Sequence, residues 1–129
     1  MEDVRVLEIG TFWAAPLVGR YLAQLGMKVT AVVRPDHVPS ARREWSRLGS
    51  SRDALRAHKR VVSLALPDEL SDALALVREA DVLVENYAPG TLDGLGLSYE
   101  ACKACNPRLV YVSLPGFIFS RSWLISEDF

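Results

Sequence analysis

The 129-residue sequence contains few cysteines and lacks both a long apolar run and an excess of charge of either sign. Its two cysteines are too few for the disulfide framework of a small secreted domain, and they fit a reducing compartment. No run approaches the roughly 20 apolar residues that span a bilayer. The acidic start "MEDVRVLEIG" lacks the basic and apolar regions of a secretory signal. We therefore predict a cytoplasmic protein without membrane contact.

The charged residues exclude one class of partner and point to another. Because the formal net charge is only −1, no overall field attracts nucleic acid, and we predict no nucleic-acid partner. The basic residues are nevertheless unevenly placed along the chain. The cluster between positions 42 and 60 comprises Arg42, Arg43, Arg47, Arg52, Arg56, Lys59 and Arg60. It predicts either a local patch for an anion or a solvated, arginine-rich helix face.

Short valine-rich runs alternate with helical patterns. Runs bounded by turn-forming residues predict β-strands at 4–10, 28–34, 60–66, 81–87 and 108–117. Helices are predicted at 15–26, 67–80 and 98–105, the last with Ser98 as its N-cap. In the first helix Pro16 suits the first turn and Gly26 the C′ position. Its predicted buried face is formed by Val18, Tyr21, Leu22 and Leu25.

The alternation of strands and helices predicts the fold class. Parallel strands need a long crossover rather than a tight hairpin, so the pattern predicts an α/β fold with a Rossmann-like, doubly wound parallel sheet of about five strands. We assign residues 1–117 to this domain and residues 118–129 to a divergent apolar tail. The tail can complete a sheet edge or pack on a second copy, and we predict a homodimer. Residues 35–59 are less regular, with a loop followed by a helix broken near Gly49.

The first strand-to-helix turn argues against a dinucleotide. "IGTFWAAPLVG" contains Gly10 but lacks the two further glycines that let a backbone approach a pyrophosphate, and Phe12 and Trp13 fill the space. After the second strand, where an NAD-binding protein carries an acidic residue for the ribose, this chain has Arg34. A guanidinium group suits a phosphate better than a ribose diol.

Polar residues also follow the fourth strand, in the stretch "ADVLVENYAPGTLDGLG". Ligands of open α/β sheets bind at the carboxyl ends of the strands, which is where Glu85, Asn86 and Tyr87 lie. Asn86 offers a donor and an acceptor, and Tyr87 offers a flat ring to an adenine or a pantetheine arm. Alternatively, Asn86 caps the loop before Pro89.

Three segments together resemble a known family. They are "VRVLEIGTFWAAPLVGRYLAQLGMKVTAVVRP", "HKRVVSLAL" and "ADVLVENYAPGTLDGLGLSYEACKACNPRLVYVSLPGF". In this order they are similar to the amino-terminal part of the family III CoA-transferases of the CaiB/BaiF type. The family includes formyl-CoA, carnitine-CoA and bile-acid-CoA transferases and the α-methylacyl-CoA racemases. The resemblance extends over about the first 117 residues.

The resemblance implies coenzyme A or an acyl-CoA as ligand and no metal. It places the first loop, with Trp13 and Ala14, against the thioester end of CoA, although a glutamine is common in the family near Trp13. Arg34 matches an arginine that binds a CoA phosphate. Two further strand ends border the nucleotide. Their residues are Leu64, Ala65, Leu66, Asn86, Tyr87 and Ala88. Ala65 replaces a usual acidic residue, and Gly94 falls where the family often has an arginine.

The chain carries no residue that the resemblance identifies as catalytic. Transferases of the family use an aspartate that attacks the thioester, and the racemases use an aspartate and a histidine. These groups follow the "GF" at 116–117, and the last residues of this chain match none of that pattern. Family members are about three times longer. The resemblance thus implies a truncated or stand-alone amino-terminal domain that is not catalytic alone.

Two alternatives remain at the level of sequence, and one of them is an NADP site that uses Arg34, which the missing glycines disfavour. The chain can act as an oligomerising protein-interaction module with a vestigial nucleotide site. Cys102 and Cys105 form a C-x-x-C motif, but they lack a second pair or a histidine at metal spacing and lie inside a predicted helix. We therefore assign them no metal or redox role.

Overall fold

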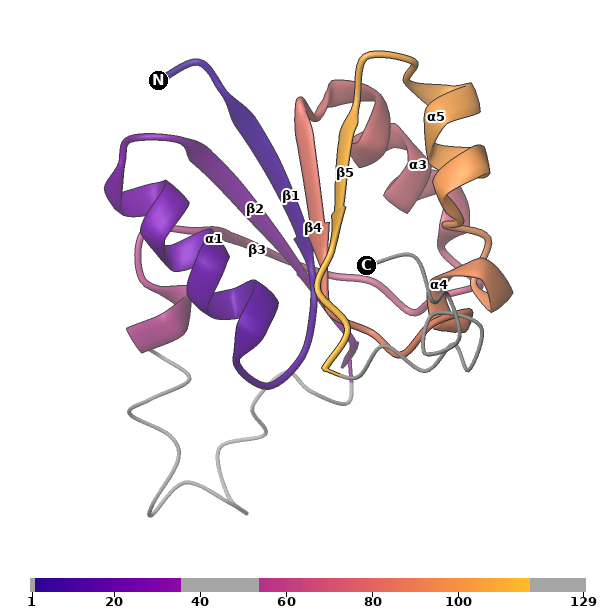
Figure 1. Cartoon of the computed structure of the whole chain (residues 1–129), viewed down its shortest axis with the longest axis horizontal. Helices are drawn as coiled ribbons and strands as arrows, with labels where there is room; N and C mark the ends of the chain where they lie inside the picture. Colours follow the sequence, from indigo (N-terminus) through magenta and orange to yellow (C-terminus); the bar gives the residue numbers. More distant parts are fainter. Residues whose placement is uncertain (1, 36–53, 117–129) are drawn as a thin grey trace, which may run out of the picture.

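A five-stranded parallel sheet forms the centre of the chain. The computed structural model describes residues 2–35 and 54–116. The strands are β1 (Arg5–Ile9), β2 (Lys28–Val33), β3 (Arg60–Ser63), β4 (Val82–Glu85) and β5 (Val110–Ser113), in the order β3-β2-β1-β4-β5 (Figure 1). All four pairings are parallel. The predicted α/β, Rossmann-like sheet is confirmed, although each strand is shorter than its apolar run.

Helices cover both faces of this sheet. α1 (Ala14–Gln24) lies on one face, whereas α3 (Leu70–Glu79), α4 (Thr91–Gly94) and α5 (Tyr99–Cys105) lie on the other (Figure 1). Crossovers between parallel strands are right-handed. When the chain adds its next strand on the other side of β1, the helix that leads to this strand therefore lies on the opposite face of the sheet. Here the order steps one way from β1 to β3 and the other way from β4 to β5. The carboxyl ends of β1 and β4 therefore flank a topological switch point.

The central strands are apolar on both faces because helices or neighbouring segments cover each side. Val6, Leu7 and Ile9 of β1 are at most 2% exposed, and Leu83 and Val84 of β4 at most 1%. Such continuous burial explains the near-continuous apolar runs that predicted parallel strands. The larger core lies on the side of α3 and α5, and a smaller core lies under α1.

The predicted inner face of α1 is partly wrong. Tyr21 is 58% exposed and Leu25 57% exposed, although the spacing placed both in the core. The helix instead lays its small side chains on the sheet, with Ala15 and Gly19 fully buried. These small residues allow a closer approach and turn the larger side chains outward. Residues of α1 that contribute to the core are Ala15, Val18, Leu22 and Ala23.

The predicted N-cap of the last helix and the predicted C′ glycine of α1 are confirmed, whereas α3 begins at Leu70 and not at the predicted position 67. The hydroxyl of Ser98 accepts a hydrogen bond from the amide of Ala101 at 3.1 Å, as an N-cap does. Gly26 follows α1 with φ = 90°, which is the left-handed region that a C′ glycine adopts. None of the described helices is long and apolar enough to cross a bilayer. The predictions for residues 36–53 and for the 118–129 tail lie outside the described residues.

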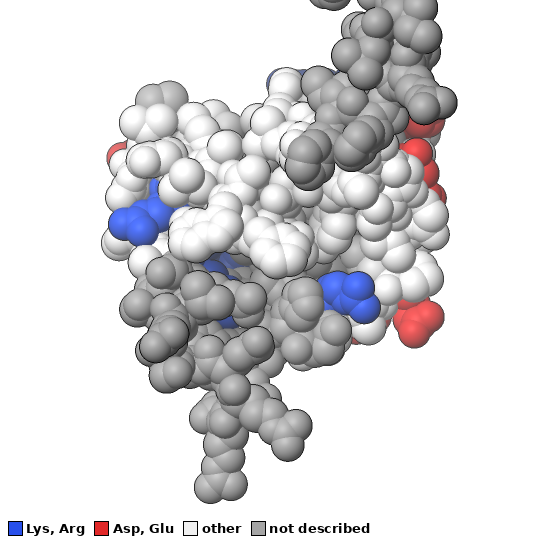
Figure 2. All heavy atoms as spheres, turned by 60° about the horizontal axis from the view of Figure 1, so that its bottom comes forward, with Lys and Arg blue, Asp and Glu red and all other residues white. Residues whose placement is uncertain are grey.

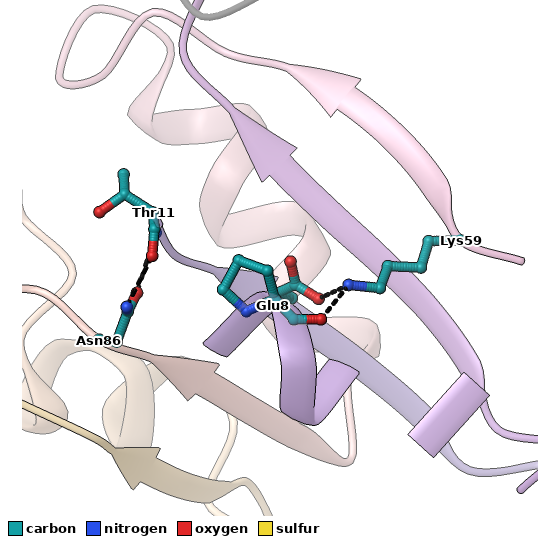
Figure 3. A network of polar contacts seen from close by, with 5 residues as sticks. Glu8, Thr11, Lys59 and Asn86 are labelled. Carbon is teal, nitrogen blue, oxygen red and sulfur yellow. Dashed lines mark hydrogen bonds and ion pairs between the residues drawn. The ribbon is translucent and has the colours of Figure 1, made fainter. Parts of the chain in front are cut away.

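A buried ion pair joins the segment before β3 to β1 and α1. The ammonium of Lys59 lies 2.6 Å from Oε2 of Glu8 and donates a second hydrogen bond to the carbonyl of Pro16 at 2.7 Å (Figure 3). The Lys59 side chain is 0% exposed and that of Glu8 is 5% exposed. A Cβ at Gly19 would overlap the Glu8 carboxylate. Lys59 therefore belongs to the interior, not to the solvated or anion-binding face predicted for the basic cluster.

Burial makes both charges of this pair costly. Desolvation raises the pKa of the Glu8 carboxyl, and the hydrogen bond and charge of Lys59 offset this rise only in part. Desolvation likewise lowers the pKa of the Lys59 ammonium against the opposing effect of Glu8. Removal of one partner from such a pair leaves a buried charge without compensation, whereas replacement of both by apolar side chains is often tolerated.

We expect Lys59→Met alone to lower the free energy of unfolding by about 3 kcal/mol, because Glu8 would remain buried without its counter-charge. The double variant Glu8→Leu/Lys59→Met should recover most of this loss. Urea unfolding followed by circular dichroism measures both. Lys28→Met is the matched control, since its ion pair with Asp3 is long at 3.7 Å and exposed, and its midpoint should not move. If the double variant loses as much free energy of unfolding as Glu8→Leu and Lys59→Met lose together when made singly, the two residues are not coupled.

Candidate functional site

Two pockets lie at the carboxyl edge of the sheet, one on each side of the switch point. The first, which we name the α1-side pocket, has a volume of about 160 Å³ and is lined by Phe12, Pro16 and Arg56 among others. The second, the α4-side pocket, has a volume of about 410 Å³ and is lined by Leu66, Leu92 and Gly94 among others. Both are at the edge where ligands of doubly wound sheets bind.

Arg34 and Tyr87 line both pockets. Arg34 follows directly after β2, and Tyr87 comes two residues after the end of β4. The guanidinium group is solvent-exposed, whereas the Tyr87 ring is half-buried and packs on the larger core. Arg34 can thus present a positive charge between the two hollows, and Tyr87 can present a ring to either.

The surface around this edge is mostly uncharged. Figure 2 turns the carboxyl edge toward the viewer and shows large uncharged side chains with a few basic groups between and beside them. A third hollow, of about 350 Å³, lies at the opposite edge, where Arg5, Lys28 and Arg60 begin their strands. It contains none of the residues predicted to bind CoA, and the site is therefore assigned to the carboxyl edge.

Asn86 joins the loop after β4 to the β1–α1 loop by two hydrogen bonds with Thr11, which we name the Asn86 clamp. Its amide nitrogen donates to the carbonyl of Thr11 at 2.7 Å, and its Oδ1 accepts from the amide of Thr11 at 2.9 Å (Figure 3). Gly10 makes this approach possible, because a Cβ there would lie 2.5 Å from Oδ1 of Asn86 and 2.5 Å from the Cβ of Ala15. The structure therefore gives Asn86 a loop-holding role close to the alternative considered from sequence, although its partner is the β1–α1 loop.

The residue after this clamp has an unusual backbone conformation. Phe12 adopts φ = 58°, a left-handed conformation that costs a bulky L-residue roughly 1–2 kcal/mol. Its side chain is 79% exposed, and Trp13 beside it is 54% exposed. Trp13 stands at the N-cap position of α1, and Ala14 is the first residue of that helix. The two predicted residues thus follow Phe12 directly in the chain, but Phe12 lines the α1-side pocket and they line neither pocket.

The carboxylate of Glu85 has a structural partner. Glu85 is 5% exposed, and its Oε2 accepts a hydrogen bond from the backbone amide of Tyr87 at 2.7 Å. The bond closes a local turn at the end of β4 and holds the backbone of Tyr87. This accounts for a carboxylate at the end of a core strand without a ligand.

Of the four remaining predicted residues, Leu66 lines a pocket and the other three do not. Leu66 lines the α4-side pocket, in agreement with its predicted position beside a nucleotide. Leu64 is 5% exposed and belongs to the core, so its side chain supports the pocket from below. The backbone amide of Ala65 donates to the carboxylate of Glu69 at 2.5 Å. Ala88 is exposed beyond the end of β4, and its carbonyl accepts from the amide of Thr91.

The cysteine pair has the character of core residues. Cys102 is 0% exposed, and burial raises the pKa of its thiol to about 11. Both cysteines are unpaired and lie inside α5. Within residues 2–35 and 54–116, no group of three metal-ligating side chains comes together.

Sequence reasoning missed Glu8, Thr11 and Lys59. Glu8 could have been noticed as a carboxylate inside an otherwise apolar strand, which calls for a buried partner. No pattern in the sequence identifies Lys59 as that partner, because 51 positions separate the two. Thr11 contributes only backbone groups to the clamp, and its side chain carries no signal.

Comparison with known proteins gives a consistent result. The family model described as CoA-transferase family III matches residues 1–120. Succinyl-CoA--D-citramalate CoA-transferase of Chloroflexus aurantiacus is 36% identical over 124 residues, which are 91% of this chain and 31% of that protein. Formyl-CoA:oxalate CoA-transferase of Streptomyces coelicolor is 32% identical over 122 residues, which are 91% of this chain and 30% of that protein.

A solved structure agrees with the sequence relatives. A CaiB/BaiF family protein from Brucella suis superimposes with a TM-score of 0.71 at 34% identity, over 90% of this chain and 33% of that one. The chain spans about a third of the length of the relatives it matches. With a five-stranded parallel sheet of the same architecture and a family match over nearly its whole length, the chain belongs to CoA-transferase family III.

Proposed function

We propose that this chain is a CoA-binding domain of a family III CoA-transferase or racemase, which holds CoA or an acyl-CoA at the carboxyl edge of its sheet. The observation that carries the proposal is the position of Arg34, whose side chain lines both pockets at the switch point. A ligand with phosphates at its centre and an arm at each end matches this arrangement. CoA has this form, with adenosine on one side of its pyrophosphate and pantetheine on the other.

The two pockets differ in the parts of CoA that they suit. The α4-side pocket is larger and is lined by apolar side chains of Leu66, Leu92 and Leu95 together with Tyr87, which suits an adenosine. The α1-side pocket is smaller, at about 160 Å³ against about 410 Å³, which suits the slender pantetheine arm and the thioester. Arg34 would then form charge-assisted hydrogen bonds with phosphate oxygens between them.

The described residues offer no free carboxylate for transfer chemistry at this site. Glu8 is held by Lys59, and Glu85 is held by the amide of Tyr87. In the family's transfer reaction a carboxylate attacks the thioester carbonyl, forms a mixed anhydride and expels the CoA thiolate. We infer that polypeptide beyond this chain supplies that carboxylate, because the chain spans about a third of its relatives' length. The chain alone should bind CoA without turning it over.

Arg34→Ala should weaken CoA binding by about 10- to 100-fold, because a charge-assisted hydrogen bond contributes roughly 1.5–3 kcal/mol. Isothermal titration of the purified chain with CoA measures the affinity, and dephospho-CoA and AMP serve as comparison ligands. AMP should be affected far less than CoA. Arg78→Ala in the last turn of α3 is the control, since Arg78 lines neither pocket. No heat with millimolar CoA would refute a retained nucleotide site.

A gain of affinity provides the opposite test. Gly94 lines the α4-side pocket with Arg34, and a Cβ at Gly94 would meet open space. Gly94→Arg should therefore tighten CoA binding by about tenfold through a second phosphate contact. Gly94→Gln has a long neutral side chain and should leave the affinity unchanged. If glutamine improves binding as much as arginine, contact area rather than phosphate charge is responsible.

A second candidate function is an oligomerising interaction module, and one surface favours it. Right-handed crossovers send the helix between β4 and β5 to the face opposite α1, so none of the described helices covers β5 on the α1 side of the sheet. Val110 of β5 is 56% exposed, and α1 exposes Leu17, Tyr21 and Leu25. We propose that a second copy packs on this apolar surface to form a homodimer.

Light scattering tests the homodimer directly. The chain should show about twice its 14.3 kDa mass at high protein concentration. The variant Tyr21→Lys/Val110→Lys should return to the monomer mass, because a buried lysine pair at the interface is costly. Val61→Lys is the matched control on the other edge strand, where Val61 is 44% exposed. A monomer mass for the unmodified chain would sink this proposal and leave the CoA proposal intact.

A further inference from the structure

The β1–α1 loop holds an aromatic side chain in the open. Phe12 has φ = 58° and is 79% exposed, so its ring contributes little to the core of the described chain. A glycine, or an asparagine, adopts this backbone conformation with less strain than a phenylalanine. The strain is therefore not offset by burial of the Phe12 ring. Residues strained in this way are concentrated at ligand sites.

The loop is fixed on both sides of Phe12. On one side Asn86 makes hydrogen bonds with both backbone groups of Thr11, at 2.7 and 2.9 Å. On the other side the carbonyl of Trp13 accepts the amide of Leu17 at 2.8 Å, which is the first hydrogen bond of α1. Phe12 is thus one residue held between a clamp and a helix start. Figure 3 shows the clamp where the β1 and β4 loops separate.

This fixed ring forms part of the wall of the α1-side pocket. Arg34 lines the same pocket, so a ligand that places phosphates on Arg34 and extends into this pocket meets Phe12 along its arm. The neighbouring Trp13 is 54% exposed and does not line this pocket, so Phe12 carries the argument. The arm of an acyl-CoA ends in its acyl group, and an aromatic wall contacts a flat, uncharged acyl group more favourably than a carboxylate.

We propose that Phe12 determines acyl specificity at this site, and that it favours a planar, uncharged aromatic acyl group over a short anionic one. Asn86 acts as the positioning residue that holds Phe12 against the pocket. This inference rests on the proposed function, because it requires CoA to bind with its pantetheine arm in the α1-side pocket. It adds the chemical class of the acyl group.

The test compares dissociation constants of the whole chain for benzoyl-CoA, succinyl-CoA and CoA by isothermal titration. The unmodified chain should bind benzoyl-CoA at least tenfold more tightly than succinyl-CoA. Phe12→Ala should reduce this ratio to less than threefold, and it should weaken benzoyl-CoA by a larger factor than it weakens CoA. Leu17→Ala is the matched control, because Leu17 is an exposed apolar residue of α1, shortly after Phe12 in the chain, and does not line the pocket. It should retain the ratio.

Two further variants separate positioning from a general effect on folding. Phe12→Gly should raise the urea midpoint, because glycine adopts positive φ without strain, while it removes the preference for benzoyl-CoA. Asn86→Asp retains the acceptor but loses the donor of the clamp. It should lower the benzoyl-to-succinyl ratio by at least threefold, because Phe12 is then held less firmly against the pocket. A lower urea midpoint with an unaltered ratio would show that Asn86 is only structural.

The outcomes distinguish this inference from the proposed function. If CoA binds and responds to Arg34→Ala, but the unmodified chain binds benzoyl-CoA and succinyl-CoA equally, the role of Phe12 is wrong and the proposed function stands. If Phe12→Ala weakens CoA and both thioesters by the same factor, Phe12 contacts the shared part of the ligand and does not determine acyl specificity. If no CoA compound binds at millimolar concentration, the proposed function and this inference both fail.

Discussion

The reversal of strand order between β1 and β4 is the constraint on which the rest of the site depends. Parallel strands joined by right-handed crossovers must send α1 and α5 to opposite faces once the order reverses, and the loops after β1 and β4 therefore diverge. Divergent loops leave backbone groups that neither strand satisfies. Asn86 meets this need by donating to and accepting from Thr11, and Gly10 leaves room for it. The strand order thus opens the crevice, and the side chain of Asn86 holds its two loops together.

The same edge of the sheet contains a costly element, the buried pair of Glu8 and Lys59. Two charges removed from water stabilise a fold less than an apolar pair of the same volume, because desolvation offsets most of their attraction. Their value lies in position: Lys59 contacts both β1 and α1 and precedes β3 directly. It fixes where the segment from Leu55 to β3 meets the sheet, and Arg56 in this segment lines the α1-side pocket. A pocket wall formed by residues distant in sequence needs a contact, such as this ion pair, that fixes their positions relative to one another.

The parts of the structure that depend on local patterns were predictable from the sequence. Strand runs, the Ser98 cap and Gly26 follow from periodicity and turn chemistry, which act over a few residues. The inner face of α1 was not predictable, because Ala15 and Gly19 set the rotation of the helix through their smallness, and a hydrophobic period weights large side chains instead. The residue types of the site were recognised at the strand ends. Their partners were not, since hydrogen bonds between positions 75 apart leave no trace in spacing.

Among the described residues, the exposed Val110 of β5 and the occupied carboxylates of the site have a common explanation. In a doubly wound sheet of this order no described helix covers the last strand, β5, on the α1 side, and Val110 is 56% exposed there. At the same time, Glu8 and Glu85 serve the structure and are not available as nucleophiles. Both observations support the proposal that this domain works with additional polypeptide, whether a second copy or a partner. Its own contribution would then be the positioning of CoA, since Arg34 and Phe12 both line the pocket and neither needs to take part in bond making.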